Sequence, residues 1–194
     1  MIGKTYTTLL AFVLTAGMLV PANALTLSVN SLFTTGDEEI IVTFQGSQAA
    51  FTNILFEDLP NEMMIFNSKT ASVGESVSLG MIGNGTELVF RLDAYSPDGT
   101  NSFGSWFSGE GSRNSDGIVH AQIGSVGNNT WVMSWEDLDF RDPTYDGDFD
   151  DVAVTIQGRN PVVPEPGTLA LVGIGLASLS GLRRRRRSRQ AAAL

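Results

Sequence analysis

The residues best suited to chemistry in this 194-residue chain are carboxylates that gather before its C-terminal region. Eight of them lie between residues 136 and 151, where Arg141 is the one basic residue. Carboxylate oxygens are the preferred ligands of Ca²⁺, which takes about six to eight oxygens. The eight acids are Glu136, Asp137, Asp139, Asp142, Asp146, Asp148, Asp150 and Asp151. This cluster predicts a site for a hard cation held by oxygen, with calcium as the candidate cofactor.

The spacing within the cluster indicates which acids are the best candidates for metal ligands. Asp146, Asp148 and Asp150 have the alternate spacing that opens an EF-hand loop, but Asp151 stands where that loop needs glycine, and no helices are expected beside it. A calcium site of another type is therefore predicted on those three aspartates, with Asp151 and Glu136 completing the oxygen shell. The alternative interpretation is that the aspartates cap turns through their own backbone amides and form a solvated acidic face.

The elements that must position these acids have a period of two. Leu88, Phe90 and Leu92 alternate with other residues, as do Trp131, Met133 and Trp135. Such alternation is typical of strands, and a series of short strands separated by Gly, Asn, Asp and Pro favours an all-β fold, an antiparallel β-sandwich or jelly-roll-like domain. Further strands are predicted at 25–29, 40–44, 53–56, 63–66, 75–79, 103–107, 118–123 and 152–157. If the last strand begins near Asp148, Asp148 and Asp150 share the buried face of Val152.

Composition excludes several classes of site. The chain has no cysteine and one histidine, His120, so thiol nucleophiles, disulfides and the usual structural zinc sites are excluded. Segment 25–160 holds five basic and twenty acidic residues, a formal charge of −15. We therefore expect no nucleic-acid partner.

The pattern of residues favours a non-enzymatic domain. His120 has no Gly-x-Ser-x-Gly nucleophile motif to serve, and we expect a partly exposed strand histidine. The alternative is a carbohydrate-binding module or a polysaccharide-acting enzyme. Glu57 with Glu136 would supply the carboxylate pair of a glycosidase, and aromatic residues of segment 103–107 would stack on sugar rings unless they pack in the core.

The N-terminus has the three parts of a secretory leader. Lys4 lies in a short polar start, an apolar run extends from Leu9 to Val20, and Ala22-Asn23-Ala24 is a small-x-small cleavage site. Residues 1–24 are therefore predicted to be a signal peptide that signal peptidase removes before Leu25. The exported acidic domain is then 25–160.

The C-terminal segment combines a proline motif, an apolar stretch and a basic cluster. A linker at 161–167 is followed by an apolar helix at 168–182, predicted to lie in the membrane, and by a basic cytoplasmic tail at 183–194. The motif is Val163, Pro164, Glu165 and Pro166, and the basic anchor is Arg183, Arg184, Arg185, Arg186 and Arg187. This order resembles the PEP-CTERM sorting signal of Gram-negative bacteria. The resemblance implies cleavage by a membrane-embedded exosortase, a transient inner-membrane anchor, and delivery to the cell surface or extracellular matrix, often alongside exopolysaccharide.

The exported domain has a resemblance of its own over about 53–157. The matching runs are Gly85-Thr86-Glu87-Leu88, Arg113-Asn114-Ser115-Asp116-Gly117, Trp135-Glu136-Asp137-Leu138 and Gly147-Asp148-Phe149-Asp150-Asp151-Val152. They are similar to the DUF4114 family, an exported bacterial domain without an agreed activity. Asp150 stands where that family prefers Asn, and the last loop is two residues shorter.

Overall fold

The computed structural model describes residues 24–28 and 30–160 of the chain. Within these residues there are eleven strands and one short 3₁₀ helix, η1. The strands are β1 (Leu25–Ser28), β2 (Ser31–Thr34), β3 (Glu38–Gly46), β4 (Thr52–Leu59), β5 (Met63–Asn67), β6 (Ser76–Ile82), β7 (Glu87–Tyr95), β8 (Ser102–Phe107), β9 (Ala121–Gly127), β10 (Thr130–Trp135) and β11 (Val152–Arg159), and η1 is Gly111–Arg113. The predicted all-β class is confirmed.

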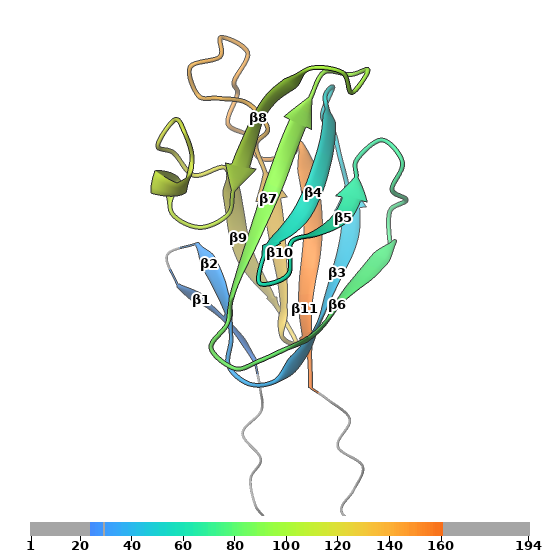
Figure 1. Cartoon of the computed structure of the whole chain (residues 1–194), viewed down its shortest axis with the longest axis vertical. Coiled ribbons are helices and arrows are strands. Elements are labelled where there is room, and N and C mark those ends of the chain that lie inside the picture. Colours follow the sequence, from blue (N-terminus) through green and yellow to red (C-terminus); the bar gives the residue numbers. More distant parts are fainter. Residues whose placement is uncertain (1–23, 29, 161–194) are drawn as a thin grey trace, which may run out of the picture.

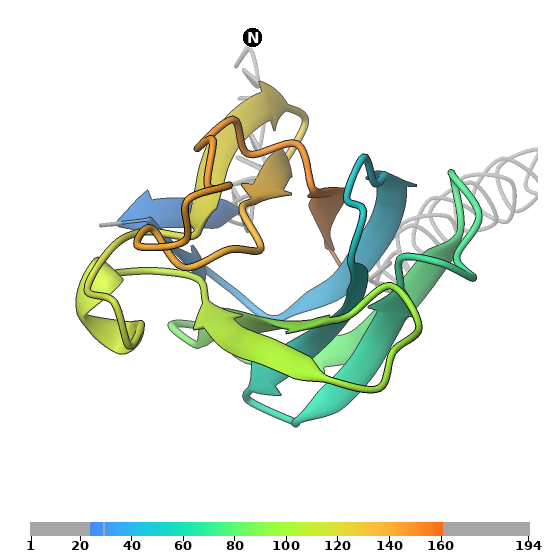
Figure 2. The ribbon, with the colours of Figure 1, turned by 90° about the horizontal axis from the view of Figure 1, so that it is seen from above.

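The strands form two antiparallel sheets that face each other (Figures 1 and 2). One sheet has the order β1-β2-β7-β4-β5, and β8 also pairs with β7. The other has the order β6-β3-β11-β10-β9. Hairpins join β4 to β5, β7 to β8 and β9 to β10, whereas β3 to β4 and β8 to β9 cross from one sheet to the other. The architecture is the predicted antiparallel sandwich.

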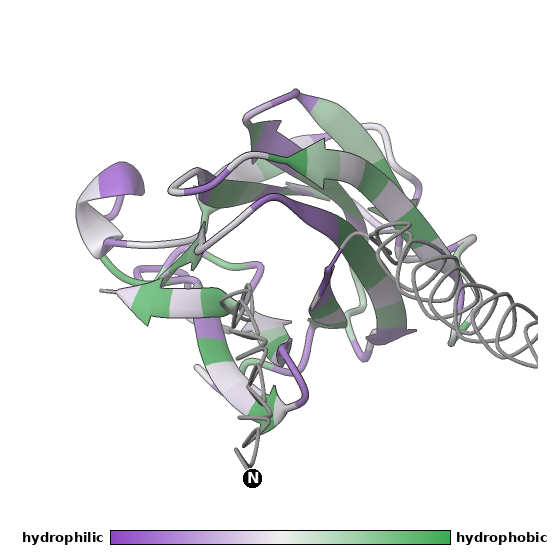
Figure 3. Ribbon diagram, turned by 90° about the horizontal axis from the view of Figure 1, so that it is seen from below, coloured by the Kyte–Doolittle hydropathy of each residue, from purple (hydrophilic) through white to green (hydrophobic). Residues whose placement is uncertain are grey.

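The core lies between the sheets and follows the period of two. Leu88, Phe90 and Leu92 of β7 are fully buried, and so are Val154 and Ile156 of β11. Figure 3 shows the same alternation as apolar and polar bands along the strands. All members of this core cluster lie between Leu25 and Ile156. The described residues therefore contain a core that joins both sheets, and segment 24–160 can be studied as a separate domain.

Some details differ from the sequence prediction. Strand β2 was not predicted, because Ser31–Thr34 is short and mixes polar with apolar residues. The final strand begins at Val152, so the predicted placement of Asp148 and Asp150 on its buried face is wrong. Both precede the strand, and Asp148 is exposed.

The predicted signal peptide and the apolar sorting helix at 168–182 lie outside the described residues. Residues 24–28 and 30–160 contain no helix that is long and apolar enough to cross a membrane.

The acidic loop and the end of the described domain lie at opposite ends of the sandwich. The loop of residues 136–151 joins β10 to β11 at the top of Figure 1, and β11 runs from there to the bottom. At about 3.3 Å per residue, the eight residues of β11 separate the two ends by about 25 Å. The carboxylates are therefore remote from Arg159.

Candidate calcium site

The register of β10 and β11 brings both ends of the acidic loop together. Trp135 pairs with Val152, so Glu136 and Asp137 leave the sheet beside the point where Asp151 enters it. The backbone N–H of Asp151 donates to the carbonyl of Trp135 at 3.2 Å. The backbone N–H of Asp137 donates to Oδ2 of Asp151 at 2.9 Å. Two acids from opposite ends of a long loop are thus in direct contact.

Local turns fold the rest of the loop. Asp142 Oδ1 accepts hydrogen bonds from the backbone N–H and the hydroxyl of Thr144, at 2.8 and 2.6 Å. Asp139 pairs with Arg141, and Asp148 Oδ1 accepts from the backbone N–H of Asp150 at 3.1 Å. The alternative prediction, that aspartates of this loop cap turns, describes these acids well. Asp139 and Asp142 therefore have structural partners of their own.

Two groups of acids remain, and Glu136 belongs to both. We call Glu136, Asp137 and Asp151 the inner group, and Glu136, Asp146 and Asp148 the outer group. Within each group, one oxygen from each residue lies within 4.8 Å of those of the other two. A cavity of about 250 Å³ lies beside them, and both Glu136 and Asp151 contribute to its wall. In each group the oxygen atoms lie close enough together to hold one divalent cation.

The two groups differ in burial. Glu136 and Asp137 are each 1 % exposed, whereas Asp146 and Asp148 are exposed. Oε2 of Glu136 is buried and has no hydrogen-bond partner, and the same is true of Oδ1 of Asn53. Asn53 is also 1 % exposed, and its Nδ2 donates to Asp137 Oδ2 at 2.7 Å. Two buried oxygen atoms without partners thus belong to residues that form or contact the inner group.

Burial and mutual repulsion make these acids hard to ionise. Desolvation, together with the charges of Asp146 and Asp137, raises the pKa of Glu136 to about 7. Desolvation and the charge of Asp137 raise the pKa of Asp151 to about 7, and desolvation raises the pKa of Asp137. Lys69 opposes the shift at Asp137, but its side chain is exposed and donates to the carbonyls of Ala49 and Ala50. Near neutral pH, Glu136 and Asp151 are therefore close to the point at which their carboxyl groups hold protons.

The structure brings together four of the five predicted ligands. Asp146, Asp148 and Asp151 each lie in a group with Glu136, whereas Asp150 belongs to neither group within the described residues. Asp137 was not among the predicted ligands. The alternation of β10 could have indicated that Asp137 is buried. Asp137 follows the buried Met133 and Trp135 at the same spacing of two residues.

His120 is a buried structural residue, so the predicted partial exposure is wrong. Its ring stacks on Trp106 with centroids 3.9 Å apart, and it is fully buried. Nδ1 lies 2.9 Å from the carbonyl oxygen of Glu136, and Nε2 lies 2.9 Å from Asp116 Oδ2. Both ring nitrogens are thus occupied by the protein, and the Trp106 indole N–H donates to the carbonyl of Asp137. This pair supports the backbone from which the acids project.

The residues predicted for a carbohydrate site are dispersed. Trp106 is buried in the core, Phe107 is partly buried, and Phe103 is exposed and packs edge-on against Phe51. Glu57 is buried on β4, where its carboxylate accepts hydrogen bonds from the backbone N–H of Asn61, and it belongs to neither group of acids that contains Glu136. The structure therefore provides no basis for the Glu57–Glu136 pair.

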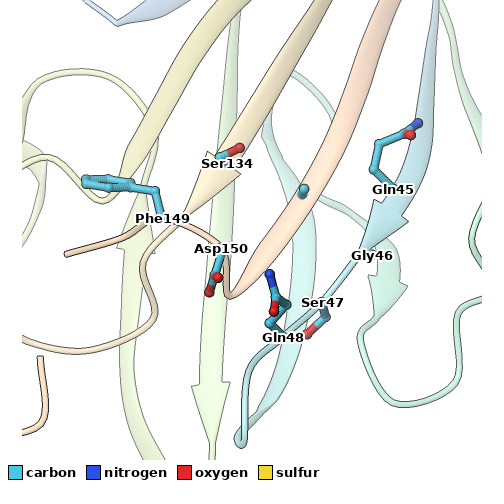
Figure 4. Close-up of a pocket in the computed structure, with 8 residues that line it drawn as sticks. Gln45, Gly46, Ser47, Gln48, Ser134, Phe149 and Asp150 are labelled. Atoms are coloured by element: carbon cyan, nitrogen blue, oxygen red, sulfur yellow. The ribbon is translucent and has the colours of Figure 1, made fainter. Parts of the chain in front are cut away.

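A second, polar hollow lies beside the acidic loop, at the start of β11 (Figure 4). Its volume is about 330 Å³, and its lining includes Gln48, Ser134 and Asp150. Figure 4 shows these three side chains near the beginning of β11, whereas the Phe149 ring points away from Gln48. Asp150 also lines the cavity beside the acid groups, so the two hollows share a wall.

Comparison with known proteins identifies the sorting segment. Residues 162–187 match the family model described as the PEP-CTERM protein-sorting motif. The predicted sorting signal is confirmed, and this motif implies an exported protein that an exosortase processes, with a membrane-anchoring C-terminal sorting region. No curated protein and no solved structure matches the chain.

Proposed function

We propose that this chain is a non-enzymatic, calcium-binding protein of the cell surface or extracellular matrix. The observation that carries the proposal is the carboxylate of Glu136, which is buried, has an oxygen without a partner, and lies in two groups of acids. A buried carboxylate is tolerated when it is protonated, hydrogen-bonded or bound to a cation. Calcium suits the site because every side-chain ligand is a hard oxygen.

The increase in the free energy of unfolding that calcium binding would cause can be estimated. Extracellular calcium sites have dissociation constants of about 10⁻⁴ to 10⁻³ M. At millimolar calcium, the tighter end of that range adds about 1.4 kcal/mol to the free energy of unfolding. Relief of repulsion among the acids is part of this binding energy. Calcium would thus act as a stabiliser of a domain that is exported into a calcium-containing medium.

The non-enzymatic assignment is supported by the state of His120. This is the single histidine of the chain, and protein atoms occupy both of its ring nitrogens. A general base must reach a substrate proton directly or through one water. Because His120 is fully buried against Trp106, it has no such access.

The assignment to the cell surface or matrix is supported by the sorting motif and by the geometry of the domain. The motif begins three residues after Arg159, and Arg159 lies at the end of the sandwich remote from the acids. A domain held through that end presents its acidic loop away from the membrane. The resemblance of segment 53–157 to DUF4114 and an association with exopolysaccharide form part of the same proposal.

The test compares thermal unfolding of residues 24–160 in millimolar calcium and in chelator. We expect calcium to raise the melting temperature by about 3–5 °C, because about 1.4 kcal/mol shifts a domain of this size by that amount. Glu136→Gln should abolish the shift, whereas Glu110→Gln, on an exposed residue outside the loop, should retain it. Coincident curves for the unmodified domain with and without calcium would contradict calcium binding.

The second candidate function, saccharide binding, is favoured by the polar hollow beside the acids. Gln48, Ser134 and Asp150 offer donors and acceptors for sugar hydroxyls, and Asp150 lies next to the proposed metal. A glycan array probed in calcium and in chelator separates the alternatives. Calcium-dependent retention of a glycan would favour a carbohydrate-binding module, and release of reducing ends would favour an enzyme.

A further inference from the structure

The inner group has a chemical environment of its own, distinct from that of the outer group. Asp137 is 1 % exposed and receives the Asn53 amide at 2.7 Å, while Asp151 receives the backbone N–H of Asp137 at 2.9 Å. The other end of the Asn53 amide, Oδ1, is buried without a partner. An amide oxygen is a common calcium ligand and carries no charge. A residue in contact with the inner group therefore offers a neutral oxygen that has no partner of its own.

The outer group differs from the inner group in two of its three acids. Its two further members, Asp146 and Asp148, are exposed and come from the middle of the loop, whereas the inner acids lie at the two ends of the loop. Only Glu136 is common to both groups. A carboxylate with two oxygens can bridge two metal ions about 3.5–4 Å apart. As the member of both groups, Glu136 is the residue that would bridge them.

We propose that the domain binds two divalent cations, with an inner ion held by Glu136, Asp137, Asp151 and the amide oxygen of Asn53, and an outer ion held by Glu136, Asp146 and Asp148. This inference rests on the proposed calcium function and adds its stoichiometry and its ligands. The five carboxylates carry five formal negative charges when ionised, and one divalent ion leaves three of them uncompensated. Two ions leave one, which lowers the repulsion that burial makes costly.

The competing explanation for the inner group is a shared proton. Asp137 and Asp151 are close enough to interact through their side chains, and a proton between them would remove one negative charge without any metal. In that case the inner position binds no ion, and the outer group alone accounts for calcium binding. The two explanations differ in the number of ions bound.

The experiment counts calcium ions on residues 24–160 at pH 8, by equilibrium dialysis with elemental analysis and by native mass spectrometry. We expect two ions per chain for the unmodified domain. Asp137→Asn should reduce the count to one through loss of the inner ion, and Asp148→Asn should reduce it to one through loss of the outer ion. Glu136→Gln should lose both. Asp142→Asn is the matched control, because Asp142 belongs to neither group and bonds to Thr144, and it should retain two.

The outcomes separate this inference from the proposed function. One ion on the unmodified domain, with Asp137→Asn unchanged, overturns the inner position and leaves the calcium function standing. No ion overturns both. Two ions that persist in Asp137→Asn overturn the ligand assignment. Asp151→Asn provides a second variant of the inner group, and circular dichroism of each variant establishes that a lower count does not come from unfolding.

Discussion

In chelator at pH 8, the Glu136→Gln domain is expected to be more stable than the unmodified domain, by about 2–3 kcal/mol in the free energy of unfolding. Glu136 is 1 % exposed, and its pKa is raised to about 7 by desolvation and by neighbouring acids. At pH 8 its carboxylate is ionised in the folded state at a cost that the neutral amide avoids. In saturating calcium the order should reverse, because the unmodified domain gains binding energy that the variant cannot gain.

The stability of the calcium-free domain should depend on pH with a defined sign. Between the unfolded pKa near 4.5 and the folded pKa near 7, the folded state holds more protons than the unfolded state. Stability of the calcium-free domain should therefore fall as pH rises through this window, and less steeply in Glu136→Gln. Urea denaturation at several pH values measures the difference between the two proteins, which includes the lower pKa of Asp151 once the charge of Glu136 is removed. Parallel pH profiles would contradict the burial of an ionisable Glu136.

Replacing Glu165 with Ala in the Pro164-Glu165-Pro166 motif is expected to abolish processing by the exosortase almost completely. This motif lies in the matched segment 162–187, and we expect the exosortase to recognise it when it cleaves. The precursor should then remain in the membrane fraction with its intact C-terminal segment. Whole-cell fractionation and intact-mass analysis in an exosortase-containing host measure the outcome.

The matched control is Glu110→Ala, in the exported domain on an exposed residue. It should be processed like the unmodified chain in the same host. In a host without exosortase, all three proteins should retain the C-terminal segment. Normal cleavage of the Glu165→Ala chain would contradict recognition of the motif.

The strands were predictable because burial on one face imposes alternation. In β7 the buried residues Leu88, Phe90 and Leu92 have the expected period, and the corresponding residues of β10 and β11 behave alike. The pairing of these strands into two sheets was not predictable in detail, because alternation fixes which side chains are buried and not which strand lies beside which. Strand β2 has four residues and is held by pairing with β1 and β7.

The site was predictable in composition and only partly in geometry. The density of acids between Glu136 and Asp151 located the loop, but the assumed start of the last strand placed Asp148 and Asp150 in the wrong environment. The buried acids are at the loop ends, because the pairing of Trp135 with Val152 draws those ends together. Asn53 comes from the other sheet, and its contact with Asp137 depends on the packing of the two sheets.

The most direct test of the calcium proposal is a crystal structure of residues 24–160 grown in calcium, with anomalous diffraction data to identify the ion. We expect anomalous density within about 2.3–2.6 Å of carboxylate oxygens of Glu136, Asp146 and Asp148, and a second peak at Asp137 and Asp151. Asp142→Asn crystals should show the same peaks. Ordered oxygens of Glu136 with water alone around them, at a calcium concentration well above millimolar, would contradict the account.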